Sequence, residues 1–188
     1  MTSIDRKPLL RFLRNQFAID WHGHHGAPHW ARVRANGLML APLTGANRHV
    51  VELFAFFHDA CRVNEHVDDG HGARGADLAG RLKGRFFEAT DEEMDLLAHA
   101  CRYHSDGRSR DDATVLTCWD ADRLDLGRVG TTPRADRLCT AAARQATILA
   151  TANARAQAWV NRRIAARGDQ KSTAQRFVSK ISPRTTRP

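Results

Sequence analysis

The segment VVELFAFF, residues 50–57, constrains this chain most, because it is apolar at all but one position and is followed directly by His58 and Asp59. A helix that is apolar on nearly every side belongs in a protein core. A carboxylate removed from water needs a compensating charge, and residues 50–58 contain no Lys or Arg. A divalent cation would supply that charge, and histidine is the commonest metal ligand. Taken alone, the pair fits equally well a histidine at the edge of the core beside a hydrated aspartate.

Four other segments with helical spacing of apolar residues each carry a His or an Asp at an end or on an inward face. His29 opens HWARVRANGLMLA, and His71 opens HGARGADLAGRL. His104 ends LLAHACRYH, and Asp122 lies within TVLTCWDADRLDL. Helical bundles build metal sites from such side chains on facing helices. The separate segments therefore strengthen the prediction of a metal site around Asp59.

The order H…HD…H…H…D resembles the HD-domain metal-dependent phosphohydrolase superfamily. HWARV, with His29, resembles its first motif, and His58–Asp59 resembles its signature pair. HGARGA and YHSDG resemble elements of the dinuclear, YqeK-like members, which hydrolyse diadenosine tetraphosphate, and DADRL resembles the final aspartate motif. The similarity extends over about residues 25–126, nearly the whole predicted body of the protein.

The resemblance implies two metal sites that share one carboxylate. By this resemblance, the ligands of the first ion are His29, His58, Asp59 and Asp122. His71 and His104 complete a second site, with Asp59 bridging the two ions. Imidazole and carboxylate ligands suit a divalent transition metal, one or two ions of Fe, Mn, Zn, Ni or Co, and the residue types do not choose among these.

Two assignments stay open on the sequence alone. Asp120 precedes Asp122 by two residues, which places the two carboxylates roughly 200° apart on one helix, and the ADRL motif favours Asp122. His71 and His104 could instead be histidines that cap their helices. In a mononuclear site these two rings would contact phosphate rather than metal.

The resemblance also implies metal-assisted hydrolysis of a phosphomonoester or phosphoanhydride in a small phosphorylated substrate, a nucleotide. We assign catalytic roles to Asp59, His71, His104 and Arg62. Arg62 lies one helical turn after His58 and could bind a phosphate oxygen bidentately; its alternative is a salt bridge with Glu65 or Asp69. Two other functions compete with this one: a di-iron oxygenase of the same superfamily, and a non-catalytic nucleic-acid-binding or regulatory module.

The loop WHGHHG carries His22, His24 and His25 and could form a further metal site. Solvated loop histidines are the alternative interpretation. His25 is the best functional candidate of the three, because it lies only four residues before His29.

We predict an all-α fold, a compact HD-domain helical bundle over residues 1–167 with a long C-terminal helix, followed by a disordered basic tail over residues 168–188. Helices are expected near 6–18, 29–41, 47–61, 71–87, 90–104, 111–126 and 133–166. No stretch has transmembrane length, and the N-terminus lacks the order of a signal peptide, so we expect a soluble cytoplasmic protein without membrane contact.

The net charge of +8 comes from the C-terminal end of the chain. Nine Lys or Arg and one acid, Asp169, lie between Arg155 and the end, and the remaining 20 basic and 20 acidic residues balance. A basic tail of this kind could make weak contact with nucleic acid. A solvated helix end is the alternative, so the basic pI says little about the predicted catalytic body.

Overall fold

A computed structural model describes residues 3–106 and 110–181, with side chains described as far as residue 166. Within these residues the chain is all-α, as predicted, and the only β pairing is two isolated bridges. The α-helices are α1 (Arg6–Gln16), α2 (Ala27–Thr44), α3 (Arg48–Phe57), α4 (His71–Leu82), α5 (Asp91–Tyr103), α6 (Ala113–Arg123) and α7 (Ala146–Ile181). Two short 3-10 helices, η1 (Leu126–Val129) and η2 (Ala135–Arg137), lie between α6 and α7.

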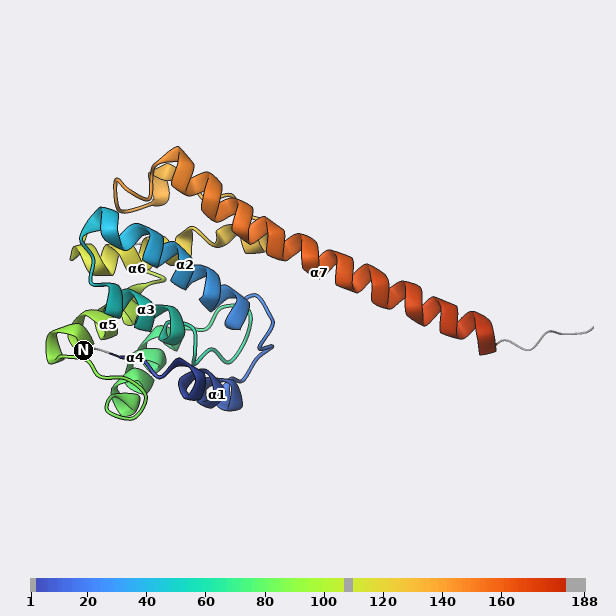
Figure 1. Cartoon of the computed structure of the whole chain (residues 1–188), viewed down its shortest axis with the longest axis horizontal. Coiled ribbons are helices and arrows are strands. Elements are labelled where there is room, and N and C mark those ends of the chain that lie inside the picture. Colours follow the sequence, from blue (N-terminus) through green and yellow to red (C-terminus); the bar gives the residue numbers. More distant parts are fainter. Residues whose placement is uncertain (1–2, 107–109, 182–188) are drawn as a thin grey trace, which may run out of the picture.

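Helix α3 is the centre of the bundle. Every residue from Val50 to Phe57 is buried, and the helix packs against α2, α4, α5 and α6 (Figure 1). The prediction of a core helix is therefore confirmed, although α3 ends at Phe57, four residues before the expected end at residue 61. Because α3 has neighbours on all sides, residues at its C-terminal end can be reached from four other helices.

The ends of several helices follow local sequence signals. Thr90 and Glu93 form a capping box at the start of α5, with side-chain to backbone distances of 3.2 and 2.9 Å. Asn47 caps α3 by accepting hydrogen bonds from the first backbone N–H groups of that helix. Gly45 ends α2 in the left-handed conformation, at φ 74°. These signals act within a few residues, so the sequence alone predicts them well.

The predicted start of the last helix is wrong. We expected it at Pro133, but α7 begins at Ala146, and residues 133–145 form η2 and irregular turns. The carboxylate of Asp120 accepts hydrogen bonds from the backbone N–H of Cys139 (2.7 Å) and from the N–H and hydroxyl of Thr140 (both 2.8 Å). Because these bonds come from α6, no local pattern in residues 133–145 predicts them.

Helix α7 also continues past Ala166, where we expected it to end, to Ile181. Its first part lies against α2 and η1, and the rest extends beyond the body (Figure 1). Residues 182–188 of the predicted tail lie outside the described residues, and the division at 167/168 stays a prediction. Among the described helices, none is both long and apolar enough to cross a membrane.

Two glycines bring α4 close to its neighbours. A Cβ atom on Gly72 would lie 2.1 Å from the backbone oxygen of Cys101 in α5, and one on Gly75 would lie 2.2 Å from that of Phe57 in α3. Neither position therefore accepts a larger residue unless the backbone moves. This close packing carries His71, the first residue of α4, to the ends of α3 and α5.

Candidate metal centre

Four histidine rings from four helices meet at the C-terminal end of α3. His29 lies in the first turn of α2, His58 directly follows α3, His71 begins α4, and His104 directly follows α5. All four side chains are buried. Asp59 lies among them, with a side-chain exposure of 4%. The structure therefore brings together five of the six residues that the motif order places in the site.

The Nδ1 atom of every one of these rings has an acceptor. The Nδ1 atoms of three rings, those of His58, His71 and His104, lie 2.6–3.1 Å from backbone carbonyl oxygens. The carbonyls belong to Phe54, Asp68 and Cys101. A carbonyl oxygen can only accept, so each of these Nδ1 atoms carries the hydrogen. In a neutral ring of this tautomer, Nε2 is left with a free lone pair.

The Nε2 atoms then face one another in two pairs. The distance is 3.1 Å between His29 and His58, and 2.9 Å between His71 and His104. Two lone pairs at this distance repel each other, so each pair needs a cation or an added proton. Two nitrogens that bind one ion at about 2.1 Å and at a right angle lie about 3.0 Å apart. The donor set therefore fits a metal ion at each pair.

The two carboxylate oxygens of Asp59 divide between the pairs. Oδ2 lies 3.5 Å from Nε2 of His29 and 3.6 Å from that of His58. Oδ1 lies 3.2 Å from Nε2 of His71 and 3.8 Å from that of His104. We call His29, His58 and Asp59 the first donor group, and Asp59, His71 and His104 the second. In each group the donor atoms lie within 4.8 Å of one another, close enough to hold one metal ion.

Asp122, not Asp120, points toward the first donor group. The Oδ1 atom of Asp122 lies 3.3 Å from Nε2 of His29 and 4.0 Å from Nε2 of His58. Asp120 is turned the other way and binds the backbone before α7, as described above. Because the two side chains lie roughly 200° apart on α6, only Asp122 faces the rings. Of the two candidates that the sequence left open, Asp122 is therefore the carboxylate available as a fourth donor.

The electrostatics of the centre favour ionised carboxylates. Burial would raise the pKa of Asp59, but the neighbouring rings of His58, His104 and His71 outweigh it and hold that pKa well below its usual value. Asp122 behaves in the same way, because its interactions with His29 exceed the effect of burial and lower its pKa. Burial lowers the pKa of His58 to about 3, so this ring is neutral. Anionic oxygens and a neutral imidazole are the forms that bind metal.

The added proton is the alternative to a cation at the second pair. Burial, the largest influence on His104, lowers its pKa, but the nearby carboxylate of Asp59 acts in the opposite direction and leaves the pKa raised. In the metal-free chain His104 can therefore hold a proton between the two rings. A bound cation would replace this proton, because it occupies the same lone pairs.

The sequence did not reveal the partner of His29. The buried carboxylate of Asp125 lies 2.7 Å from Nδ1 of His29, and it also accepts two hydrogen bonds from Arg32, at 2.6 and 3.0 Å. Burial would raise the pKa of Asp125, but the bonds from His29 and Arg32 lower it. A carboxylate on Nδ1 fixes the tautomer and orientation of a metal-binding histidine. The only sequence signal was the presence of a third aspartate in DADRLD, after Asp120 and Asp122.

Arg62 lies at the edge of the second donor group. Its Nη1 atom is 3.4 Å from Nε2 of His71 and 3.9 Å from Oδ1 of Asp59, and Nη2 donates to the backbone oxygen of His66 at 3.0 Å. Its buried Nε atom has no hydrogen-bond partner within the described residues. The contact with Asp59 takes the place of the salt bridge to Glu65 or Asp69 that we considered as its alternative.

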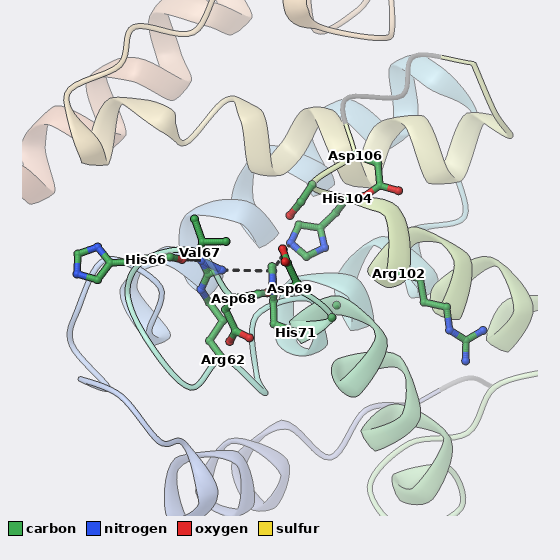
Figure 2. A pocket seen from close by; sticks show the side chains of 12 residues that line it. Arg62, His66, Val67, Asp68, Asp69, His71, Arg102, His104 and Asp106 are labelled. Atoms are coloured by element: carbon green, nitrogen blue, oxygen red, sulfur yellow. Dashed lines mark hydrogen bonds between the residues drawn. The ribbon is translucent and has the colours of Figure 1, made fainter.

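A pocket of about 240 Å³ opens beside Arg62, His71 and His104. Figure 2 shows the rings of His71 and His104 facing each other with Arg62 next to them, whereas the side chains of His66 and Arg102 point away. A ligand that enters this pocket therefore meets the second donor group and one buried guanidinium. That combination suits an anionic group such as phosphate.

The three loop histidines have separate environments. The ring of His25 pairs with Glu65 at 2.5 Å, and its centre lies 6.3 Å from that of His29. His24 packs edge-on against Trp159, and His22 is exposed. None of the three belongs to either donor group. The structure thus places His25 beside the centre, and its functional role stays a prediction.

Comparison with known proteins supports the fold. A solved structure described as a predicted HD superfamily hydrolase, from an uncultured Thermotogales bacterium, matches with a TM-score of 0.61 and 24% identity. The match covers 86% of this chain and 92% of that chain. No protein-family model matches the sequence, and no curated protein matches it significantly. The chain therefore has the helical fold of an HD superfamily hydrolase, with a buried His/Asp cluster able to hold metal ions.

Proposed function

We propose that this protein is a metal-dependent phosphohydrolase that hydrolyses a phosphomonoester or phosphoanhydride. The observation that carries the proposal is the division of the Asp59 carboxylate between two pairs of facing imidazole nitrogens. Such an arrangement suits two cations a few ångströms apart. Paired sites of this kind occur in many phosphatases and nucleases.

The cations are one or two divalent transition metal ions, Fe, Mn, Zn, Ni or Co, whose ligand preferences match imidazole and carboxylate. When bound, they supply a water made acidic enough to attack at neutral pH and positive charge for the phosphate oxygens. The ligands would be His29, His58, Asp59, His71, His104 and Asp122.

The residues of the chain itself bind and orient the substrate. The Arg62 guanidinium lines the pocket beside the second donor group, where it can bind a phosphate oxygen. Asp125 orients His29, and the backbone carbonyls of Phe54, Asp68 and Cys101 orient the other three rings. The donor atoms are thus held in place before any ligand binds, which reduces the conformational entropy lost on binding.

A nucleotide is the substrate class that we propose. The support is the resemblance of HGARGA and YHSDG to elements of diadenosine tetraphosphate hydrolases. The similar solved structure, described as a predicted HD superfamily hydrolase, agrees with a hydrolytic reaction. The buried guanidinium of Arg62 agrees with an anionic substrate.

The test is metal analysis of the purified chain, followed by assays with nucleotides, dinucleoside polyphosphates and cyclic dinucleotides. We expect turnover that is lost on chelation and restored by one divalent metal. The matched variants are Asp59→Asn, which should abolish turnover, and Asp95→Asn, which changes an exposed carboxylate of α5 outside the pocket and should not. Phosphate release unaffected by stringent metal removal would refute the proposal, and iron-dependent oxygen consumption would favour the di-iron oxygenase instead.

Contact between the basic tail and nucleic acid is a separate proposal. It is supported by the nine Lys or Arg and the single acid between Arg155 and residue 188, with Arg155 included. We expect weak binding to nucleic acid that falls as salt rises and is lost on deletion of residues 168–188. Such binding in a chain without metal-dependent turnover would favour the regulatory module.

A further inference from the structure

Trp159 of α7 is connected to the first donor group through two buried side chains. The ring centre of Trp159 lies 4.5 Å from Cζ of Arg32, so the guanidinium lies over the indole. Arg32 donates two hydrogen bonds to Asp125, which is bonded in turn to Nδ1 of His29. All four side chains are buried. The contacts form an unbroken series from the last helix to a predicted metal ligand.

Each contact restricts the next. The indole face attracts the guanidinium and limits its rotation. The two bonds from Arg32 hold the carboxylate of Asp125 in one orientation and neutralise its charge. Asp125 then keeps the hydrogen of His29 on Nδ1, which leaves Nε2 free to face His58 and Asp59. Without the Arg32 guanidinium, the buried carboxylate of Asp125 would lose two hydrogen bonds and keep only the more distant cation of Arg128, whose Nε atom lies 3.8 Å from Oδ2.

The position of α7 determines whether this series exists. Arg32 lies in α2, Asp125 precedes η1, and α7 packs against both of these elements. The backbone around Asp125 is held separately by Arg128, which donates to the backbone oxygens of His24 (2.9 Å) and Asp125 (3.3 Å). Loss of the indole would therefore free the Arg32 guanidinium while the backbone of η1 stays in place.

We propose that Asp125, Arg32 and Trp159 are positioning residues for His29, and that the packing of α7 through Trp159 sets the metal affinity of the first donor group. The inference rests on the proposed metal site. The second donor group contains none of these residues, and its rings are oriented by backbone carbonyls of α5 and of the loop before α4. Its affinity should therefore be independent of α7.

The experiment is titration of Mn²⁺ into the metal-free full-length chain, with wild type compared with Trp159→Leu and Trp159→Phe. Trp159→Leu should weaken binding of one ion about tenfold or more and leave the other unchanged, because loss of outer contacts to a ligand histidine typically costs about 10–100-fold. Trp159→Phe keeps an aromatic face and should lose less. Equal binding by wild type and Trp159→Leu would overturn the proposal.

Ile148→Ala is the matched control. Ile148 lies in α7 and packs in a separate apolar cluster with Leu40, Leu124 and Leu138. Its truncation weakens the packing of α7 without touching Arg32, so Mn²⁺ affinity should stay within about twofold of wild type. A loss as large as that of Trp159→Leu would show that helix packing in general, not this series of contacts, affects the metal, and would overturn the assignment.

A second measurement separates this inference from the proposed function. If wild type binds no divalent metal, the proposed function fails, and the positioning is then judged from the imidazole ¹⁵N signals of the metal-free chain. The His29 signals are those missing from His29→Gln. Trp159→Leu should shift the His29 signals toward a mixture of tautomers, whereas Ile148→Ala should give the same signals as wild type. Unchanged signals in Trp159→Leu would reject the proposed effect of Trp159 on His29.

Discussion

The Nε2 atoms of His71 and His104 lie 2.9 Å apart, although the Nδ1 atom of each ring is held by a backbone carbonyl. Two neutral rings of this tautomer cannot form a hydrogen bond with each other. The arrangement is stable only with a positive charge between the rings, as a proton or as a metal ion. Since Asp59 adds a carboxylate oxygen 3.2 Å from His71, the position is suited to a cation.

Replacement of His71 by Ala should remove the second metal ion. The second donor group would keep only two members, and three ligands are the usual number in catalytic sites. We expect about one ion fewer per chain and a loss of turnover of at least about 100-fold. Metal analysis and phosphate release provide the measurements. His66→Ala changes an exposed histidine of the same pocket and should match wild type; full metal content in His71→Ala would contradict the prediction.

Asp122→Asn should affect metal binding, whereas Asp120→Asn should affect stability. Asp122→Asn should lower metal affinity about tenfold or more, because it removes an anionic donor beside His29. Asp120→Asn should leave affinity nearly unchanged and lower the free energy of unfolding by about 2 kcal/mol, because it weakens three charge-assisted hydrogen bonds. Urea denaturation of the metal-free chains and metal titration measure the two effects, and a reversed outcome would assign the ligand to Asp120.

Gly72→Ala should damage both stability and the metal centre. The added Cβ would lie 2.1 Å from the backbone oxygen of Cys101 and would push α4 away from α5, which separates His71 from His104. We expect the free energy of unfolding to fall by roughly 1–3 kcal/mol, typical of overpacking, and the metal content to be reduced.

Gly80→Ala is the matched control for that variant. Gly80 lies in the same helix, α4, and an added Cβ meets no atom within 4 Å. Because Ala favours helix over Gly, Gly80→Ala should raise the free energy of unfolding by about 0.5–1 kcal/mol. Thermal unfolding followed by circular dichroism compares the two; equal stability of both variants would refute the close-packing argument.

Glu52 should make stability depend on pH in the acidic range. Burial would raise the pKa of Glu52, but its hydrogen bonds with Arg6 and Arg34 outweigh burial and lower it. A carboxyl whose folded-state pKa is depressed stabilises the fold above its ordinary value of 4.5 and loses that contribution as pH falls through the folded-state value. Glu52→Gln should thus melt lower than wild type at pH 7, with a difference that shrinks below about pH 4. A difference independent of pH between 7 and 3 would contradict this.

Local patterns predicted much of the fold. The capping box at Thr90, the apolar run that ends at Phe57 and the breaks between helices involve residues a few positions apart, and their physical effect is complete within one turn of helix. They therefore predicted the number and order of the main helices. The start of α7 was missed, because the bonds from Asp120 to Thr140 join residues twenty positions apart.

What the sequence by itself determined is the all-helical class and the set of His and Asp residues that meet in the centre, because periodicity and motif order are properties of the linear chain. Only the tertiary structure decided which carboxylate of α6 faces the rings, how Asp59 divides its oxygens, and that Asp125 and Arg32 stand behind His29. Arg32 and Asp125 are 93 residues apart and of common types. Their pairing depends on where two helices pack, and no spacing along the chain encodes that position.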